Sequence, residues 1–342
     1  MNDSSIQSAA NLRFHEALAA IYKLSCAQKL RVFIVGGAVR DHLLRGIRSE
    51  GRLHFVSDID LMIEGDARQF AELVNAEFSG TLLRFDRFFS AKIKAPQLFS
   101  EIQEIDFAST RAETYERPGA LPLVTLASLD DDLRRRDFSI NAMALQLEES
   151  GIFPSADQLM DTARNSPILH DKFAGRSALL RREISVLHSA SFLDDPTRLF
   201  RAIRYAERFG FALAAETEQM FYAAISTGAL QTASNVRIFN EIKKMLREEQ
   251  RSEEMLQRVI SSSLLQFWTP VLGVPVADLS QAFAGLVQSP LFKPTVPPSV
   301  AGTEKELLLL RTLFELNPKS DPLTWGLSLS NKVIKQIRTS IF

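Results

Sequence analysis

The sequence predicts an α+β protein, with a mixed sheet and packed helices in its amino-terminal part and helices in the remainder. Two observations support this fold class. Short apolar runs of strand character, separated by glycine turns or polar loops, recur through residues 1–146. From about Asp194 to Ile260, most apolar residues recur with a period near 3.6, and alternation of the strand type is absent. We expect three parts: 1–146, 147–250 and 251–342.

The composition is that of an ordinary globular protein. The chain has 342 residues, 46% of them hydrophobic and 24% charged, which at about 150 residues per domain allows two or three domains. Lys and Arg number 40 and Asp and Glu 41, so any contact with a polyanion must use local basic patches. The single cysteine, Cys26, excludes an intrachain disulfide and a cysteine-rich zinc site.

The sequence also lacks the usual signs of membrane insertion or export. No run of 18 apolar residues occurs, and the first residues show no basic region followed by an apolar stretch. We therefore expect a cytoplasmic protein without a membrane partner.

The elements of the amino-terminal part follow from local periodicity. Residues 12–28 have helical apolar spacing, and RVFIVGG predicts a buried strand that runs into a glycine turn. Further helices are expected at 38–44 and in ARQFAELVNAEF, and further strands in DIDLMIEG, TLLRF, AKIKA and EIQEIDFAS.

Helix signals also mark the carboxyl-terminal part. Six of the 14 prolines fall between Pro270 and Pro298, which indicates turns or a joint between helical pieces. Thr303 with Glu306 has the spacing of a capping box before LLLLRTLFEL, and Ser330 precedes a last apolar pattern, NKVIKQI.

Two adjoining glycines, Gly36 and Gly37, follow the strand expected in RVFIV. Glycines let the backbone come close to a ligand, and the N–H groups of the turn and of the next helix favour a phosphate. A simple tight turn has the same sequence pattern. The glycines therefore predict a phosphate site only together with other groups.

Asp58 and Asp60 stand two positions apart in an expected strand, so both side chains point to one face of the sheet. Neighbouring carboxylates repel unless a cation lies between them, and their oxygens suit Mg²⁺. A third carboxylate on a neighbouring strand would complete a two-metal site for phosphoryl or nucleotidyl transfer. We select Asp106 for this place, with Glu104 as its rival. The alternative is that Asp106 pairs with an arginine such as Arg111.

Residues 130–137 form a charge cluster, DDDLRRRD, which precedes an apolar helical run. Clustered guanidinium groups suit a triphosphate, and an aspartate can accept hydrogen bonds from ribose hydroxyls. Because three aspartates offset the three arginines, a solvated surface is the alternative interpretation.

A second arginine-rich segment is SFLDDPTRLFRAIRYAERFGF. Pro196 suits the first turn of a helix, with Asp194 or Asp195 at its cap. Four arginines then share one broad arc of this helix: Arg198, Arg201, Arg204 and Arg208. The row predicts either a phosphate-binding face or structural pairing with Glu207 and its neighbours.

Taken together, these segments resemble the class II tRNA nucleotidyltransferase and bacterial poly(A) polymerase family. Five stretches match its successive motifs in order: GGAVRD (36–41), SDIDLMI (57–63), RRDFSINAMA (135–144), DDPTRLFRAIRYAERFGF (194–211) and ASNVRIFNEIKKML (233–246). The resemblance runs from about Val32 to Leu246. The family's usual Glu-Asp pair at the start of the fourth motif is Asp194-Asp195 here, which keeps the charge.

The resemblance implies a polymerase-β-like head at 1–146, a helical neck at 147–250 with base-selecting and RNA-binding motifs, and a tRNA-binding body and tail at 251–342. It also implies roles for single residues. Asp58 and Asp60 would hold catalytic Mg²⁺ ions. The groups around the nucleotide would be Gly36, Gly37, Arg40, Arg136, Asp137, Asp195, Arg198, Arg201 and Arg204.

Asp195 and Arg198 match the family's base-selecting pair, and the chemistry of the bases agrees. Cytosine and adenine each present an amine donor beside a ring-nitrogen acceptor, whereas uracil and guanine reverse this pattern. A carboxylate with a guanidinium can therefore accept CTP and ATP and reject UTP and GTP.

The resemblance thus implies attack of a tRNA 3′-hydroxyl on the α-phosphorus of CTP or ATP, with release of pyrophosphate. It leaves open whether the product is CCA, CC or A alone. Residues Thr110 to Val124 match the family's flexible loop and look intact, which disfavours a CC-adding specialist. The helical half would hold tRNA by its phosphates and shape, with Lys332, Lys335 and Arg338 as candidate contacts or as a solvated face.

Two other functions compete with tRNA addition. A poly(A) polymerase would share all five motifs, but the chain has no strongly basic extension for diverse RNA. A nucleotidyltransferase that acts on small molecules would keep the glycine turn and the aspartates, but it would not need the helix of Asp195 and Arg198.

Overall fold

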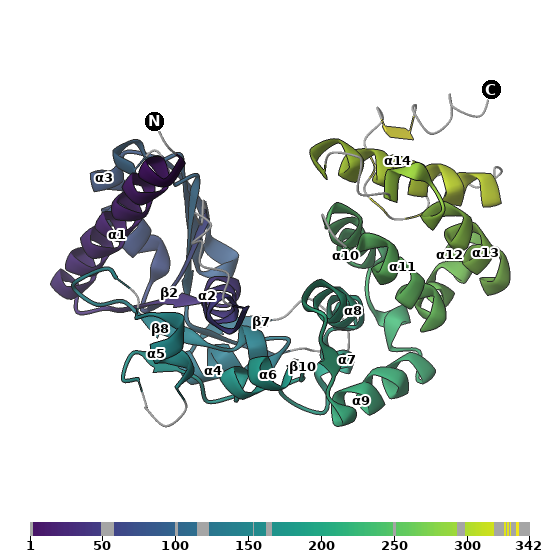
Figure 1. Cartoon of the computed structure of the whole chain (residues 1–342), viewed down its shortest axis with the longest axis horizontal. Helices are drawn as coiled ribbons and strands as arrows, with labels where there is room; N and C mark the ends of the chain where they lie inside the picture. Colours follow the sequence, from purple (N-terminus) through teal and green to yellow (C-terminus); the bar gives the residue numbers. More distant parts are fainter. Residues whose placement is uncertain are drawn as a thin grey trace. The chain divides into compact units, whose positions relative to one another are not determined.

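The computed structural model describes residues 3–48, 58–99, 102–114, 123–152, 154–161, 166–248, 251–292, 298–317, 325, 327, 329 and 333–334. It divides into two compact units. The head unit comprises Met1–Thr114, Pro122–Arg181 and Ser185–Leu187. The helical unit comprises Tyr115–Leu121, Arg182–Ile184 and His188–Phe342. The predicted α+β class is confirmed, with the sheet in the purple-to-teal part of Figure 1 and successive helices in the green-to-yellow part.

A seven-stranded mixed sheet forms the centre of the head unit. Its strands, in spatial order, are β3 (Thr81–Phe85), β4 (Ser90–Lys94), β5 (Glu104–Ser109), β2 (Asp58–Glu64), β1 (Arg31–Val35), β8 (Ala144–Gln146) and β9 (Leu169–His170). Only β2 and β5 pair in parallel among these neighbours. The strands expected from RVFIV, DIDLMIEG, TLLRF, AKIKA and EIQEIDFAS are therefore all present, at slightly adjusted ends.

Helix α3 (Ala67–Phe78) covers one face of this sheet. It follows a polar cap, because the Asp66 side chain accepts a hydrogen bond from the Arg68 N–H. Its buried Phe70 packs edge-to-face on Phe107 of β5, with ring centroids 6.2 Å apart. Buried and partly exposed residues alternate along β5, so Ile105 and Phe107 point toward α3. The charged residues of β5, Glu104 and Asp106, lie on the other face of the sheet.

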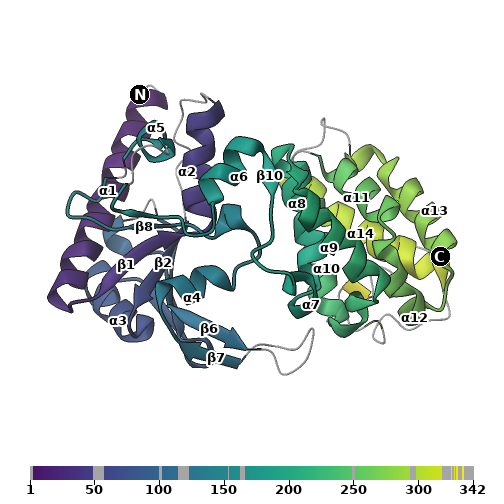
Figure 2. The same ribbon diagram turned by 90° about the horizontal axis from the view of Figure 1, so that it is seen from below.

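Other elements complete the head unit. The helices are α1 (Asp3–Ala27), α2 (Gly37–Arg48), α4 (Leu129–Arg134), α5 (Ala156–Met160) and α6 (Gly175–Arg181), with short 3₁₀ turns η1 (Asp86–Phe88), η2 (Gln97–Phe99) and η3 (Ser139–Asn141). Strands β6 (Arg111–Thr114) and β7 (Leu123–Leu126) form a separate antiparallel hairpin, seen beside α4 in Figure 2. They lie at either end of the predicted flexible loop, and residues 115–122 are outside the described part.

The helical unit is built from short and medium helices. These are α7 (Ser191–Asp194), α8 (Thr197–Phe209), α9 (Ala215–Ser226), α10 (Asn235–Arg247), α11 (Ser252–Ser261), α12 (Thr269–Leu272), α13 (Val276–Val287) and α14 (Pro298–Leu316), with 3₁₀ turns η4 (Ala229–Thr232), η5 (Leu264–Trp268) and η6 (Pro290–Phe292). A two-residue parallel pair, β10 (Glu183–Ile184) with β11 (Ala212–Leu213), is an addition that the periodicity does not reveal. Phe200, Phe267 and Trp268 contribute to the core.

The ends of two predicted helices are corrected. Helix α14 begins at Pro298, so Thr303 lies inside it and the expected capping box is wrong as a helix start. Pro196 stands just before α8, and the Asp195 carboxylate accepts a hydrogen bond from the Thr197 N–H at 3.0 Å. The helix expected after Ser330 lies outside the described residues, apart from Val333 and Ile334.

Among the described residues, no single helix is both long and apolar enough to span a membrane. The bent pair Leu264–Leu272 and Val276–Val287 reaches the length and composition of a span when its two halves are combined.

Candidate active site

The glycine turn lies at the end of β1, beside the carboxylates of β2. Strand β1 pairs with β2 so that Ile34 stands opposite Leu61. Continuing this antiparallel register by one residue places Val35 opposite Asp60. Gly36 then follows with φ of +66°, a backbone conformation that L side chains rarely adopt. The turn therefore begins at the end of the sheet where Asp60 stands.

Arg40 and Asn141 fix the first turn of α2. Arg40 is only 4% exposed, and its Nη1 donates to Asn141 Oδ1 at 2.5 Å while its Nε donates to Asp41 at 2.8 Å. Asn141 in turn donates through Nδ2 to Asp137 Oδ1 at 3.0 Å. The Asn141 side chain thus bridges Arg40 and Asp137, two predicted site residues from distant motifs.

Arg136 packs against the glycine turn. Its Nη1 donates to the Asn141 carbonyl at 3.2 Å and would lie only 2.9 Å from a Cβ atom built on Gly36. Glycine is therefore required at this position both by its backbone angle and by the space that Arg136 fills. The first and third motifs of the sequence come together at this turn.

The carboxylates of the metal hypothesis share one face of the sheet. The parallel register of β2 and β5 sets Asp60 opposite Asp106 and Asp58 opposite Glu104. The Asp58 side chain is outside the described part, so only its backbone position on β2 is known. The register brings the predicted third carboxylate, Asp106, next to Asp60.

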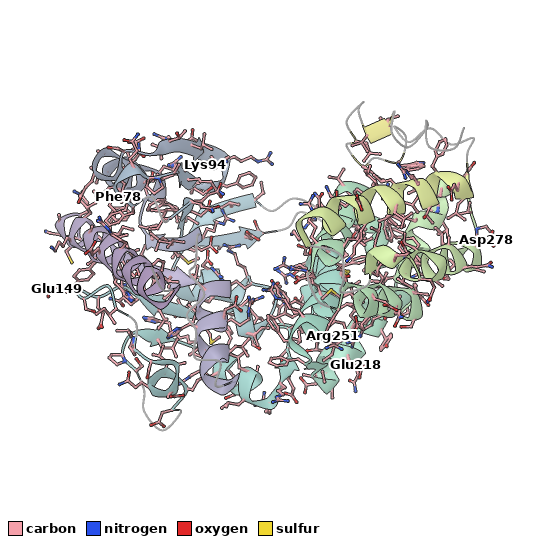
Figure 3. All side chains as sticks on the ribbon, turned by 45° about the horizontal axis from the view of Figure 1, so that its top comes forward. Phe78, Lys94, Glu149, Glu218, Arg251 and Asp278 are labelled. Atoms are coloured by element: carbon pink, nitrogen blue, oxygen red, sulfur yellow. The ribbon has the colours of Figure 1, made fainter. Side chains whose placement is uncertain are left out.

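Lys92 of β4 is the ionic partner of this carboxylate row. It stands opposite Asp106 in the antiparallel register, and its Nζ lies 3.2 Å from Asp106 Oδ2. It also donates to Glu104, which has a second ion pair with Lys94 at 3.4 Å; Lys94 is labelled in Figure 3. The hydrogen bond from Lys92 lowers the pKa of Glu104. The predicted alternative partner, Arg111, is wrong: the partner is Lys92.

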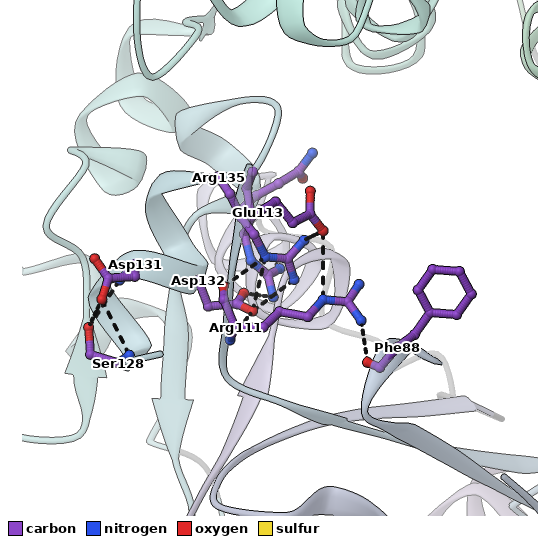
Figure 4. Close-up of polar contacts among 9 residues, drawn as sticks. Phe88, Arg111, Glu113, Ser128, Asp131, Asp132 and Arg135 are labelled. Atoms are coloured by element: carbon purple, nitrogen blue, oxygen red, sulfur yellow. Dashed lines mark hydrogen bonds and ion pairs between the residues drawn. The ribbon is translucent and has the colours of Figure 1, made fainter. Parts of the chain in front are cut away.

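The DDDLRRRD segment is only in part a solvated surface, because Asp131 and Arg134 are exposed but Asp132 is not. Asp132 is fully buried at 0% exposure, and five side chains form what we call the arginine cluster: Arg111, Glu113, Asp132, Arg135 and Arg136. Figure 4 shows Arg135 between Asp132 and Glu113. Burial lowers the pKa of Arg136 and of Arg111, and the nearby charge of Arg135 adds to both shifts.

In the helical unit, Asp195 and Arg198 are held by neighbouring polar groups. The Oδ2 of Asp195 lies 2.8 Å from Nη2 of Arg237 on α10. Arg198 is 5% exposed, and its Nη1 donates to Ser191 Oγ at 2.6 Å. Sequence reasoning did not single out Arg237, although it lies inside the fifth matched motif.

The remaining arginines of α8 pair with α10 and the chain that follows it. Arg201 and Arg204 lie 3.8 and 3.7 Å from oxygens of Glu241, and Arg204 also reaches Glu248 at 3.3 Å. Glu207 was the expected partner, and this detail is wrong. The Glu207 carboxylate contacts Arg251, just before α11, and Arg258 on α11 instead.

Asn141 and Asp132 are the other side chains that sequence reasoning missed. Asn141 carried a usable signal, because it lies four residues after Asp137 within a matched motif. Asp132 carried none, since three adjacent aspartates look alike until one of them is buried. Lys332, Lys335 and Arg338 lie outside the described residues.

The oxygen ligands on β2 and β5 suit a hard cation. Among the side chains that the structure describes, no three carboxylate, imidazole or thiol groups gather to hold an ion, and Asp58 is not among them. Mg²⁺ often binds through one or two carboxylates together with substrate phosphates. Adjacent Asp60 and Asp106 fit such a partial site.

The chain is similar to several known proteins. Residues 32–183 match the family described as "Poly A polymerase head domain". An A-adding tRNA nucleotidyltransferase of Aquifex aeolicus is 40% identical over 222 residues, which are 64% of this chain and 23% of that protein. The corresponding enzyme of Halalkalibacterium halodurans is 33% identical over 275 residues, 80% of this chain and 57% of that protein. The chain thus spans from about a quarter to somewhat over half of these relatives.

Solved structures extend the similarity beyond the head domain. A tRNA nucleotidyltransferase complexed with a primer tRNA and an incoming ATP analog has a TM-score of 0.66 and 28% identity, over 94% of this chain and 83% of that one. An apo CCA-adding enzyme gives a TM-score of 0.67 and 28% identity, over 97% of this chain and 70% of that one. Residues 32–183 thus carry the head domain of this family, and most of the chain is similar to tRNA nucleotidyltransferases.

Proposed function

We propose that the chain is a template-independent tRNA nucleotidyltransferase that adds CCA, or part of it, to the tRNA 3′ end from CTP and ATP. One observation carries the proposal. A glycine turn with two basic side chains, Arg40 and Arg136, adjoins a strand whose carboxylates face those of its neighbour. Basic groups at a turn suit a triphosphate, and adjoining carboxylates suit the metal that accompanies it.

In the proposed reaction the tRNA 3′-hydroxyl attacks the α-phosphorus of the nucleotide. The new O3′–Pα bond forms as the bond to the bridging oxygen of the β-phosphate breaks, pyrophosphate leaves with the electron pair, and the hydroxyl proton passes to solvent. The Gly36 N–H donates to the Met143 carbonyl at 3.3 Å, so the turn brings the Gly37 N–H to the phosphates, and Arg40 and Arg136 balance their charge. Mg²⁺ held by Asp58, Asp60 and Asp106 would activate the hydroxyl and support the leaving group.

Base choice is proposed to depend on Asp195 and Arg198. Thr197 and Arg237 fix the carboxylate of Asp195, and Ser191 fixes Arg198, so both groups are held in defined orientations. A preorganised acceptor and donor can discriminate strongly between bases, because the wrong base leaves buried polar groups unpaired.

The choice among CCA, CC and A addition is a narrower proposal. Relatives named as A-adding enzymes share 33–40% identity with this chain, one named as CC-adding shares 32%, and those named as CCA-adding share 27–28%. These identities favour A addition. Poly(A) synthesis on other RNA is the competing function, since the head domain is shared with poly(A) polymerases.

The test uses the purified protein with Mg²⁺ and three labelled tRNA transcripts, which end before CCA, after the first C, or after CC. Each is offered CTP, ATP or both. Extension of only the CC-ended transcript by ATP identifies an A-adding enzyme, and growth of all three to CCA identifies a complete one. Long adenylate tails on unrelated RNA support poly(A) polymerase. Absence of extension from every RNA contradicts nucleotidyl transfer to RNA.

A further inference from the structure

Asp132 is the most deeply buried carboxylate near the glycine turn. Burying a charge is costly unless other charges and hydrogen bonds compensate for it. Its Oδ2 accepts hydrogen bonds from Arg135 Nε at 3.1 Å, from Arg135 Nη2 at 2.7 Å and from the Arg111 N–H at 3.3 Å. Its Oδ1 accepts one from Arg136 Nη2 at 3.4 Å. One side chain on α4 therefore orients two guanidinium groups and the first residue of β6.

The same contacts lead from the glycine turn to the β6–β7 hairpin. Arg136 touches the turn at Gly36, and Asp132 joins Arg136 to Arg135. Arg135 continues to β6, where its Nη1 donates to Glu113 Oε1 at 2.6 Å and its Nε to the Arg111 carbonyl at 3.2 Å. The path runs wholly within the head unit.

The arginine cluster carries an excess of positive charge. Its three guanidinium groups face two carboxylates, Asp132 and Glu113. The buried Nε atoms of Arg111 and Arg136 have no hydrogen-bond partner among the described residues. An anion beside Arg136 would balance this charge, and the turn that Arg136 touches is the proposed phosphate site.

We propose that Asp132 is a positioning residue for the triphosphate: its carboxylate holds the Arg136 guanidinium against the Gly36 turn and, through Arg135, ties that arginine to Glu113 on the hairpin. The inference rests on the proposed function, because it concerns binding at the same site. It assigns no contact with substrate to Asp132. Loss of the positioning role should weaken triphosphate binding. Loss of a negative charge alone, near a triphosphate, should instead strengthen it.

The first experiment compares Asp132→Asn with Asp130→Asn in the full chain. Both raise the net charge by one on the same helix, but the Asp130 side chain is 41% exposed and forms an ion pair with Lys172. Equilibrium binding of CTP, ATP, CMP and AMP is measured for each variant. We expect Asp132→Asn to weaken triphosphate binding roughly tenfold, as loss of charge-assisted hydrogen bonds implies, and to change monophosphate binding less than about twofold. Asp130→Asn should leave triphosphate binding at or slightly above the wild-type level.

A second variant protects the test against misfolding of Asp132→Asn. Glu113→Gln leaves Asp132 in place and weakens the contact of Arg135 with Glu113 on β6. It should weaken CTP or ATP binding by about threefold, and it should add little when combined with Asp132→Asn, because both act through Arg135. Additive losses, or a Glu113→Gln variant with wild-type affinity, would overturn the coupling to the hairpin.

The outcomes separate the two proposals. If the wild-type chain binds no nucleoside triphosphate, the proposed function itself fails. If the wild type binds CTP or ATP and Asp132→Asn binds it equally or more tightly, the positioning role is wrong while the proposed function stands. An equal loss in Asp130→Asn would likewise refute positioning, because the loss would then not depend on the contacts of Asp132 with Arg135 and Arg136.

Discussion

Asp106 and Glu104 stand on the same face of β5, yet the sheet engages them differently. Glu104 forms ion pairs with Lys92 and Lys94, whereas Asp106 stands opposite Asp60 and forms an ion pair with Lys92. Asp106 is therefore better placed to join Asp60 at a cation. This contrast distinguishes two carboxylates that the sequence pattern leaves as rivals.

We predict that Asp106→Asn lowers nucleotide incorporation by roughly two orders of magnitude or more, as expected for a group that supports transition-state charge. Glu104→Gln should change it by less than about tenfold. Both rates are measured with labelled nucleotide over a series of Mg²⁺ concentrations. The reverse order of the two effects would assign the third carboxylate to Glu104.

Lys305 is a second residue whose surroundings determine its contribution to stability. It is 6% exposed, and its Nζ donates to Ser252 Oγ at 2.8 Å and lies 4.7 Å from the Phe292 ring centroid. Burial lowers the pKa of this lysine. The unfolded chain therefore binds more protons than the folded one between the lowered pKa and the ordinary value of about 10.4. Stability should rise with pH across that window.

We predict that Lys305→Met raises the free energy of unfolding by about 1 kcal/mol at pH 7, because a buried ammonium with a single neutral acceptor is replaced by an apolar chain of similar length. The gain should shrink as the pH approaches 10. Denaturant unfolding at several pH values measures it, with Lys243→Met as the control. A loss of stability in Lys305→Met at pH 7 would show that the ammonium is stabilising.

Among the elements, α1 depends on a close backbone contact that local periodicity does not reveal. Gly151 has φ of +62°, and a Cβ there would lie 2.3 Å from the His15 carbonyl oxygen and 2.8 Å from the Ala19 nitrogen. His15 also contacts the Gly151 carbonyl through Nδ1 at 3.0 Å. The helix thus packs directly on the turn after β8.

We predict that Gly151→Ala lowers the free energy of unfolding by about 2 kcal/mol or more, from the left-handed backbone and the clash with α1. Gly285→Ala is the matched control: its Cβ would meet no atom within 4 Å, and alanine in helix α13 should stabilise by about 0.5–1 kcal/mol. Thermal unfolding of both variants tests this. Wild-type stability of Gly151→Ala would contradict the described packing of α1.

Elements are also the scale at which the sequence is most informative. Strands β1 to β5 and helix α3 follow from short apolar runs and 3.6-residue periodicity. One face is buried in β4, β5 and α3, whereas β1 is buried on both faces and β3 follows from its apolar run although most of its residues are exposed. The hairpin β6–β7 and the pair β10–β11 do not. Their strands have only four and two residues, so they offer too few positions for a period to emerge.

For the whole molecule, the site depends on contacts between residues far apart in the sequence. Arg40 and Asn141 are 101 positions apart, and Lys92 reaches carboxylates on another strand. Motif order anticipates which residues matter, and the resemblance to a known family names their roles. It does not reveal that Asp132 is buried or that Asn141 joins Arg40 to Asp137, because both facts arise from packing of α2, α4 and η3.

We propose that the carboxylate face of β2 and β5, beside the glycine turn, performs nucleotidyl transfer. The most direct measurement compares wild type, Asp60→Ala and Asp86→Ala for incorporation of labelled nucleotide into tRNA, with tRNA binding measured in parallel. Asp86 is an exposed aspartate that pairs with Arg68 and Arg84 away from the turn. We predict background incorporation with nearly unchanged tRNA binding for Asp60→Ala, and wild-type values for Asp86→Ala. Full incorporation by Asp60→Ala would contradict the claim.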